Sequence, residues 1–160
     1  MKTLYLVRHA KSSWEFDLDD HERPLNERGL NDAPKVAQKV AQLIDLPQLW
    51  LSSDAMRAKT TAVFFAQAFD IPDSKIELRP KLYDFSGQAV VDIICSVDDS
   101  VDTLIVFGHN NAMTSIVNFY GNKKIDNVPT CGFTAITFDI ERWQDLEKGK
   151  TIHTIIPKQL

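Results

Sequence analysis

Two histidines of this chain each follow a short apolar segment. His9 stands beside Arg8 directly after residues 3–7, and His109 lies close behind residues 103–107. Continuous β-prone segments of this kind predict buried strands, and a side chain at the end of such a strand is held rigidly. A neutral imidazole is a good nucleophile toward phosphorus, and water can hydrolyse the phosphohistidine that results. His9 is therefore the candidate nucleophile, and His109 is a candidate for stabilising charge on phosphoryl oxygens. The alternative for His109 is a histidine bonded to nearby backbone.

Arginines near these positions are candidate phosphate ligands. Arg8 and His9 can serve one site only if the chain turns directly after His9, because neighbouring strand residues point to opposite faces. Arg57 follows residues 52–54, which are of N-cap types, so its guanidinium and a helix N-terminus could both bind phosphate oxygens. The alternative is an exposed Arg57 that pairs with Asp54.

The elements that position these residues alternate between strands and helices. Asn26 is expected to cap a helix that ends before Pro47, with Pro34 tolerable only near its start. Strands are expected at residues 3–7, 49–51, 75–78, 103–107, 133–140 and 151–156, and further helices from 52–54 onward, at 88–97 and at 112–120. Such alternation predicts a mostly parallel central sheet with helices on both faces, an α/β/α three-layer sandwich. No linker divides the chain, so residues 1–160 are expected to form a single domain.

Composition restricts the partners of the protein. The net charge of −4 and the pI near 5.5 argue against nucleic acid or an anionic membrane as the main partner. Five basic residues nevertheless fall near the same end of the predicted sheet, which indicates a small basic pocket: Lys11, Arg23, Arg28, Arg57 and Lys59. The N-terminus lacks the apolar core of a signal peptide, so a cytoplasmic location is expected.

Metal and cofactor sites find no support in the residue spacing. The four histidines lack ligand spacing, and the chain has neither a P-loop pattern nor a glycine-rich dinucleotide turn, so no metal or cofactor is expected. Cys95 and Cys131 stand apart and are interpreted as buried free thiols. Trp14 and Phe16 lie in the polar loop 11–24; packing of this loop onto the domain is the favoured interpretation, and covering of a pocket is the alternative.

Four segments together resemble a known family. Residues 6–14 (LVRHAKSSW) resemble the opening motif of the histidine phosphatase superfamily, the phosphoglycerate-mutase-like fold, in its short SixA-type branch of phosphohistidine phosphatases. Residues 23–29 (RPLNERG), 52–62 (SSDAMRAKTTA) and 106–110 (VFGHN) are similar to its later motifs, in the same order. Ala10 stands where the family usually carries glycine.

The resemblance implies a covalent mechanism. His9 would accept the phosphoryl group, and Arg8, Arg57 and His109 would form the phosphate pocket, with Arg23 at its mouth. Larger branches place a glutamate after the third strand as general acid, whereas this sequence offers Asp84; a helix cap before Gln88 is the alternative for that residue.

A site without a strong acid suits a labile phosphoryl donor. The expected function is therefore a phosphatase for phosphohistidine in proteins. A small-molecule phosphomonoesterase acting on sugar or nucleotide phosphates is the alternative, and a phosphate-binding interaction module without appreciable activity is the third interpretation.

Overall fold

The computed structural model describes residues 1–160. Its strands are β1 (Lys2–Arg8), β2 (Leu49–Ser52), β3 (Ile76–Leu78), β4 (Thr103–Gly108), β5 (Phe133–Phe138) and β6 (Lys150–Ile155). Its α-helices are α1 (Glu27–Leu43), α2 (Met56–Ala68), α3 (Gln88–Cys95) and α4 (Ala112–Tyr120). None of these helices combines the length and the apolar character needed to span a membrane.

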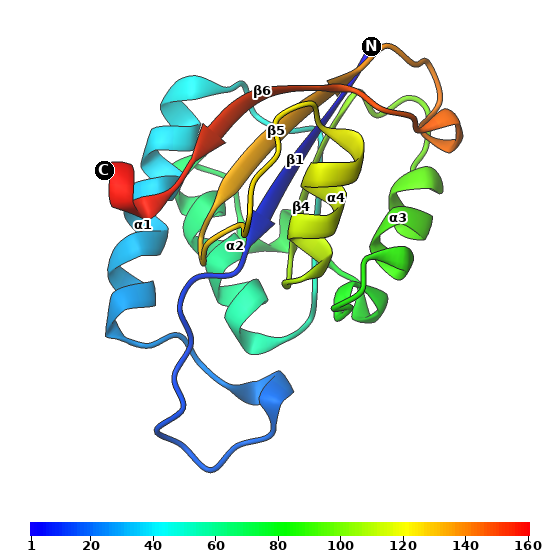
Figure 1. The fold of residues 1–160 in the computed structure, drawn as a ribbon. Helices are drawn as coiled ribbons and strands as arrows, with labels where there is room; N and C mark the ends of the chain where they lie inside the picture. Colours follow the sequence, from blue (N-terminus) through cyan, green and yellow to red (C-terminus); the bar gives the residue numbers. More distant parts are fainter.

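All six strands belong to one sheet in the order β3-β2-β4-β1-β5-β6. The first four run parallel, whereas β5 is antiparallel to both β1 and β6. Figure 1 shows β1 in the middle of the sheet, with α1 and α2 on one side and α3 and α4 on the other. The predicted three-layer α/β/α sandwich with a mostly parallel sheet is confirmed.

The side chains of β1 explain why both faces are covered. Leu4 and Leu6 are buried among residues of α3 and α4, whereas Tyr5 and Val7 are buried among residues of α1 and α2. Because neighbouring strand residues point to opposite faces, an unbroken apolar strand requires a layer of helices on each side. β1 is thus fixed at the centre of the molecule, and its end is a rigid position.

Three local predictions need correction. α2 begins at Met56 rather than at the N-cap types before it, because Ser52 continues β2 and the N-cap position is Ala55. Pro34 lies inside α1 rather than near its start, although Asn26 caps the helix as expected by accepting from the Gly29 N–H. Cys131 is buried, but Cys95 is only partly buried; both are free.

The carboxyl ends of three neighbouring strands bring the candidate residues together. Arg8 of β1 lies in register with Gly108 of β4, and Phe107 of β4 lies in register with Ser52 of β2. Beyond β1, a loop projects from the body before the chain returns into α1 (Figure 1). An isolated bridge between Ser12 and Leu25 closes the root of this loop.

Candidate active site

The chain leaves β1 along a path that backbone contacts determine. The His9 N–H donates to the Gly108 carbonyl (3.0 Å), and the His9 carbonyl accepts from the Cys131 N–H (3.0 Å). The Ala10 N–H donates to Thr61 Oγ1 of α2 (2.9 Å). The chain therefore turns out of the strand directly after His9, and the side chains of Arg8 and His9 line the same pocket.

The contacts of the His9 ring define which of its nitrogens carries the proton and which carries the lone pair. Nδ1 lies 2.7 Å from the Ala10 carbonyl oxygen, which can only accept, so Nδ1 carries the proton. Nε2 then holds a lone pair, and it accepts from Nε of Arg57 at 3.3 Å. Burial, followed by the charges of nearby arginines, lowers the pKa of His9 to about 3. At neutral pH the ring is thus an uncharged nucleophile with Nε2 facing the pocket.

Arg57 is the second residue of α2 and is almost fully buried. Besides its contact with His9, its Nη2 pairs with Asp20 Oδ2 at 2.8 Å. The exposed alternative for Arg57 is not observed, since Asp54 instead pairs with His21 at 2.8 Å. The guanidinium therefore lies beside the candidate nucleophile, where its remaining N–H groups can bind an oxyanion.

Arg8 supplies a second guanidinium to the same pocket. Its Nη1 donates to the Val128 carbonyl at 2.8 Å, while its buried Nε has no hydrogen-bond partner within the chain. Burial lowers the pKa of Arg8, although an arginine still remains charged at neutral pH. A buried donor of this kind costs free energy unless it is satisfied, and a phosphate oxygen would satisfy it.

His109 is completely buried, and its ring lies 5.3 Å from the ring of His9. Its Nε2 lies 2.8 Å from Ser53 Oγ, and Ser53 Oγ also accepts from the Ala55 N–H at 3.1 Å. The hydroxyl proton of Ser53 has no other acceptor within reach, so it is donated to Nε2, and the ring proton of His109 lies on Nδ1. That Nδ1 is buried without a partner.

The protonation of His109 also follows from its surroundings. Burial, and then the nearby His9 and Arg57, lower the pKa of His109 to about 3. It therefore stays neutral at pH 7 and can act through its Nδ1–H as a hydrogen-bond donor rather than as a cation. The alternative, in which the His109 ring bonds to nearby backbone, is not observed, because its hydrogen bond is to the side chain of Ser53.

Arg23 lies at the edge of the pocket in the extended conformation expected before Pro24. Its Nη1 donates to Ser12 Oγ at 2.8 Å, and the ring of Trp14 stacks on its guanidinium at 3.5 Å. Trp14 and Phe16 are otherwise exposed, so the favoured interpretation, in which they pack the loop onto the domain, is wrong. The loop is held at its root instead.

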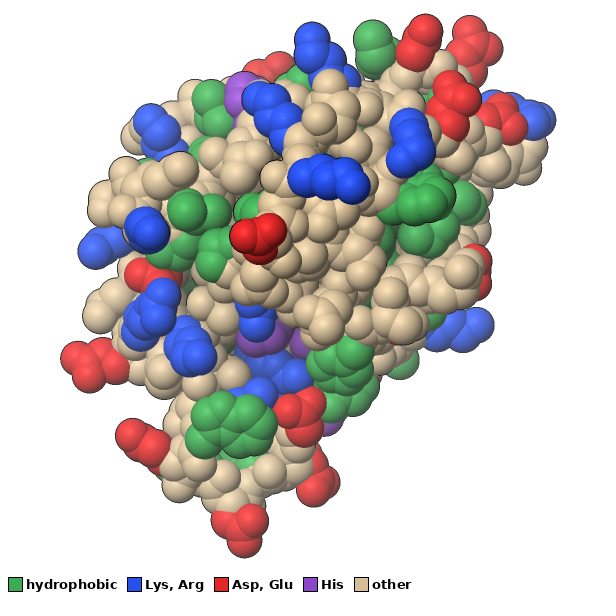
Figure 2. All heavy atoms as spheres, viewed as in Figure 1, with side chains coloured by type: hydrophobic (Ala, Val, Ile, Leu, Met, Phe, Trp, Pro, Cys, Tyr) green, Lys and Arg blue, Asp and Glu red, His purple; other side chains and the backbone are tan.

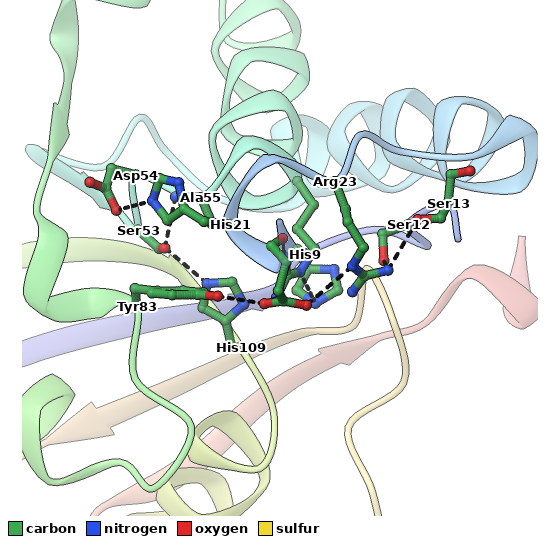
Figure 3. A network of polar contacts seen from close by, with 12 residues as sticks. His9, Ser12, Ser13, His21, Arg23, Ser53, Asp54, Ala55, Tyr83 and His109 are labelled. Atoms are coloured by element: carbon green, nitrogen blue, oxygen red, sulfur yellow. Dashed lines mark hydrogen bonds and ion pairs between the residues drawn. The ribbon is translucent and has the colours of Figure 1, made fainter. Parts of the chain in front are cut away.

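Sequence reasoning missed Asp20, which lines the pocket, and Tyr83, which donates a hydrogen bond to it. Asp20 binds Arg57 through Oδ2 and Arg23 through Oδ1 (3.1 Å), and it accepts from the Tyr83 hydroxyl. Partial burial alone would raise the pKa of Asp20, but the hydrogen bonds from Tyr83, Arg57 and Arg23 outweigh it and hold the pKa well below its usual range. Figure 3 shows Tyr83 and His109 to one side of His9 and Arg23 to the other, with the network between them.

Asp84 lies outside the pocket and makes the contacts of a helix cap. Its Oδ2 accepts from the backbone N–H groups of Gly87, Ala89 and Val90, and its Oδ1 accepts from the Ser86 N–H. Burial opposes ionisation, yet these hydrogen bonds lower the pKa of Asp84 overall. A carboxylate engaged in this way is a poor proton donor, so the capping alternative describes Asp84.

The pocket gathers positive charge from part of the predicted basic group. Lys11, Arg23 and Arg57 line it, whereas Arg28 is exposed and pairs with Asp32, and Lys59 lies in a separate depression. The cavity holds about 490 Å³. In Figure 2 basic and histidine side chains fill the hollow between the projecting loop and the body. Such a cavity suits a small anion or a phosphoryl group on a larger molecule.

Comparisons with known proteins agree with this arrangement. A model of the histidine phosphatase superfamily (branch 1) matches residues 4–90. An uncharacterized chloroplastic protein of Arabidopsis thaliana is 30% identical over 155 residues, which cover 90% of this chain and 70% of that protein.

Solved structures share the whole fold. The SixA protein of Agrobacterium tumefaciens superimposes with a TM-score of 0.82 and 25% identity, covering 98% of each chain. The protein histidine phosphatase SixA in complex with tungstate superimposes with a TM-score of 0.80 and 17% identity, again over 98% of each chain. The chain therefore belongs to branch 1 of the histidine phosphatase superfamily, with the phosphoglycerate-mutase-like fold of its SixA-type members.

Proposed function

We propose that this protein hydrolyses phosphohistidine in proteins through a covalent intermediate on His9. Membership of the histidine phosphatase superfamily supports phosphatase activity in general. The observation that carries the mechanism is the lone pair on His9 Nε2. The Nδ1–H bond to Ala10 places it there, and it accepts only a long hydrogen bond from Nε of Arg57 at 3.3 Å.

The first step transfers the phosphoryl group. Nε2 attacks phosphorus, an Nε2–P bond forms, and the bond from phosphorus to the substrate's imidazole breaks. Its electron pair leaves on that imidazole, which carries a proton on its other nitrogen and so departs as a neutral molecule. Charge on the phosphoryl oxygens is stabilised by Arg8, Arg57 and the Nδ1–H of His109. Arg23 extends this cationic surface toward the mouth.

The second step regenerates the enzyme. Because Nδ1 keeps its proton, the phosphorylated ring of His9 is cationic and is a good leaving group. Water attacks phosphorus and the Nε2–P bond breaks. Dihydrogen phosphate leaves with both protons of the water, while Nε2 regains its lone pair. The Ala10 carbonyl accepts the Nδ1–H throughout and favours the cationic ring.

The lack of a protonated acid in the pocket supports phosphohistidine over an alkyl phosphate. Asp20 is the carboxyl group that lines the pocket, and its lowered pKa keeps it ionised. A phosphohistidine ring that carries a proton on its other nitrogen releases a neutral imidazole without an acid of the enzyme, whereas a sugar alkoxide needs a proton from a nearby acid. Hydrolysis of sugar or nucleotide phosphates is therefore the slower alternative in this proposal.

A panel of substrates tests the proposal. Phosphate release is measured from a phosphohistidine peptide, p-nitrophenyl phosphate and glucose 6-phosphate, with His9→Ala as the inactive control. We expect kcat/KM to fall in that order by about a hundredfold or more from first to last. Equal or greater rates on glucose 6-phosphate would favour the small-molecule alternative, and no hydrolysis of any substrate would leave a phosphate-binding module.

A further inference from the structure

Residues 14–19 of the projecting loop, here called the arm, expose large apolar side chains at alternate positions. Trp14 is 75% exposed, Phe16 57% and Leu18 44%. Figure 1 shows the loop extending away from the sheet and helices. Soluble proteins seldom gather large apolar side chains in water unless the surface has a binding role.

The arm is presented from a fixed root. The Ser13 N–H donates to the Pro24 carbonyl at 2.8 Å, and Arg23 binds both Ser12 Oγ and the Ser13 carbonyl. Arg23 is itself buried and carries Trp14 stacked on its guanidinium. The apolar side chains of the arm are thus held beside the pocket rather than on a detached chain.

The arm is continuous with the candidate active site. Trp14 lines the pocket, and Phe85, which is 46% exposed, lines it from the segment before α3. Phe16 and Leu18 lie beyond the pocket. A small phosphate ester held at His9 would end short of these two residues, whereas a protein surface around a phosphorylated side chain would extend over them.

The charge of the arm indicates the chemistry of its partner. Glu15, Asp17 and Asp19 alternate with the apolar residues, and all three are exposed without an ion pair. Figure 2 shows acidic side chains around the outside of the projecting loop, below the pocket. Carboxylates at this position repel a free phosphate ester and attract basic groups, so they favour a partner with its own positive charge.

We propose that the arm is a docking surface for a protein whose phosphohistidine is surrounded by apolar and basic side chains. The proposal rests on the proposed function and names the partner of the same site. The apolar residues of the arm supply contact area, and its carboxylates select for basic partners. The pocket itself holds only the phosphoryl group and its imidazole.

The test compares a large and a small substrate. The variant is Phe16→Ser/Leu18→Ser, and the matched control is Phe119→Ser, an equally exposed apolar residue on α4 (58%). The substrates are core histone phosphorylated on histidine with phosphoramidate, and free phosphohistidine. We expect kcat/KM on the histone to fall about tenfold or more in the arm variant, mainly through KM, with hydrolysis of free phosphohistidine unchanged.

A second comparison tests the charge. Succinylation of the phosphorylated histone's lysines reverses its charge and should lower kcat/KM for the wild-type enzyme about tenfold, while Glu15→Gln/Asp17→Asn should remove most of that difference.

Three outcomes would overturn the docking surface. They are equal losses on both substrates in the arm variant, no loss on the histone, and arm-dependent binding of the enzyme to phosphatidylcholine vesicles instead of protein. If the wild-type enzyme hydrolyses neither phosphohistidine substrate, the proposed function itself fails, which is distinguishable from failure of the arm alone.

Discussion

Ser53→Ala should show whether the position of the ring proton on His109 matters for activity, because the variant keeps His109 but removes the hydroxyl that sets its tautomer. The substitution removes the hydroxyl that donates to His109 Nε2 and accepts from the Ala55 N–H, and both Ser53 and His109 are fully buried. Without that donor, the ring proton of His109 can move to Nε2, and Nδ1 then presents a lone pair to the phosphoryl oxygens instead of an N–H.

The magnitude follows from the hydrogen bonds that are lost. Two buried polar groups lose a partner, which should cost about 1–3 kcal/mol of stability, or a fall in Tm of roughly 2–12 °C for a chain of this size. Loss of one donor to the phosphoryl oxygens should lower kcat about tenfold to a hundredfold, since the donor is weakened rather than deleted.

Ser52→Ala is the matched control for this experiment. Ser52 is equally buried and donates to the Ser53 carbonyl at 2.9 Å, but it makes no contact with either histidine. Thermal denaturation, kcat on p-nitrophenyl phosphate and ¹⁵N NMR of the imidazole nitrogens give the three readouts. If Ser53→Ala loses stability but keeps wild-type kcat and an Nδ1–H on His109, the role assigned to Ser53 is refuted.

Three further predictions concern the pocket and its surroundings. Arg57→Lys should lower kcat/KM about a hundredfold, because an ammonium cannot replace the planar donors beside His9, whereas Arg28→Lys should leave activity unchanged. Asp84→Ala should cost about 0.5–2 kcal/mol in a denaturant titration through the lost cap, with kcat altered less than about threefold for any leaving group; a large loss confined to poor leaving groups would restore Asp84 as the acid. His9 and His109 both have their pKa lowered to about 3, so the unfolded chain, with values near 6.5, binds more protons below that pH. The contribution of these two histidines to the free energy of unfolding should thus be fully present above about pH 6.5. Toward pH 3 it should fall by up to ~1.4 kcal/mol per pH unit for each histidine. If the free energy of unfolding of His109→Gln depends on pH as steeply as that of the wild type, this prediction is contradicted.

The sequence predicted most of the fold because apolar segments and caps are local signals. The unbroken apolar character of β1 and the Asn26 cap of α1 were sufficient to place the central strand and the first helix. The start of α2 was missed because Ser52 and Ser53 have N-cap side chains but are drawn into the sheet and toward His109 by tertiary contacts.

The candidate site was predictable only in part for the same reason. His9, Arg8, Arg57 and His109 lie at strand ends or just after them, and the topology brings such positions together. Asp20 begins a 3-10 helix of three residues (Asp20–Glu22), which is too short for a sequence periodicity to indicate. Its contacts with Arg57 and Arg23 depend on how the loop around it folds back. Asp84 is an acidic residue before a helix. Such a position is equally compatible with a helix cap and with a general acid.

The covalent intermediate is the most direct test of the proposed mechanism. Enzyme mixed with a ³²P-labelled phosphohistidine peptide and quenched within milliseconds in alkali should carry one label that is stable in base and released by acid. Tandem mass spectrometry should locate it on His9, and ³¹P NMR should assign it to Nε2 rather than Nδ1. Absence of the label from His9→Ala together with loss of turnover is the expected result, and continued turnover in that variant would contradict the mechanism.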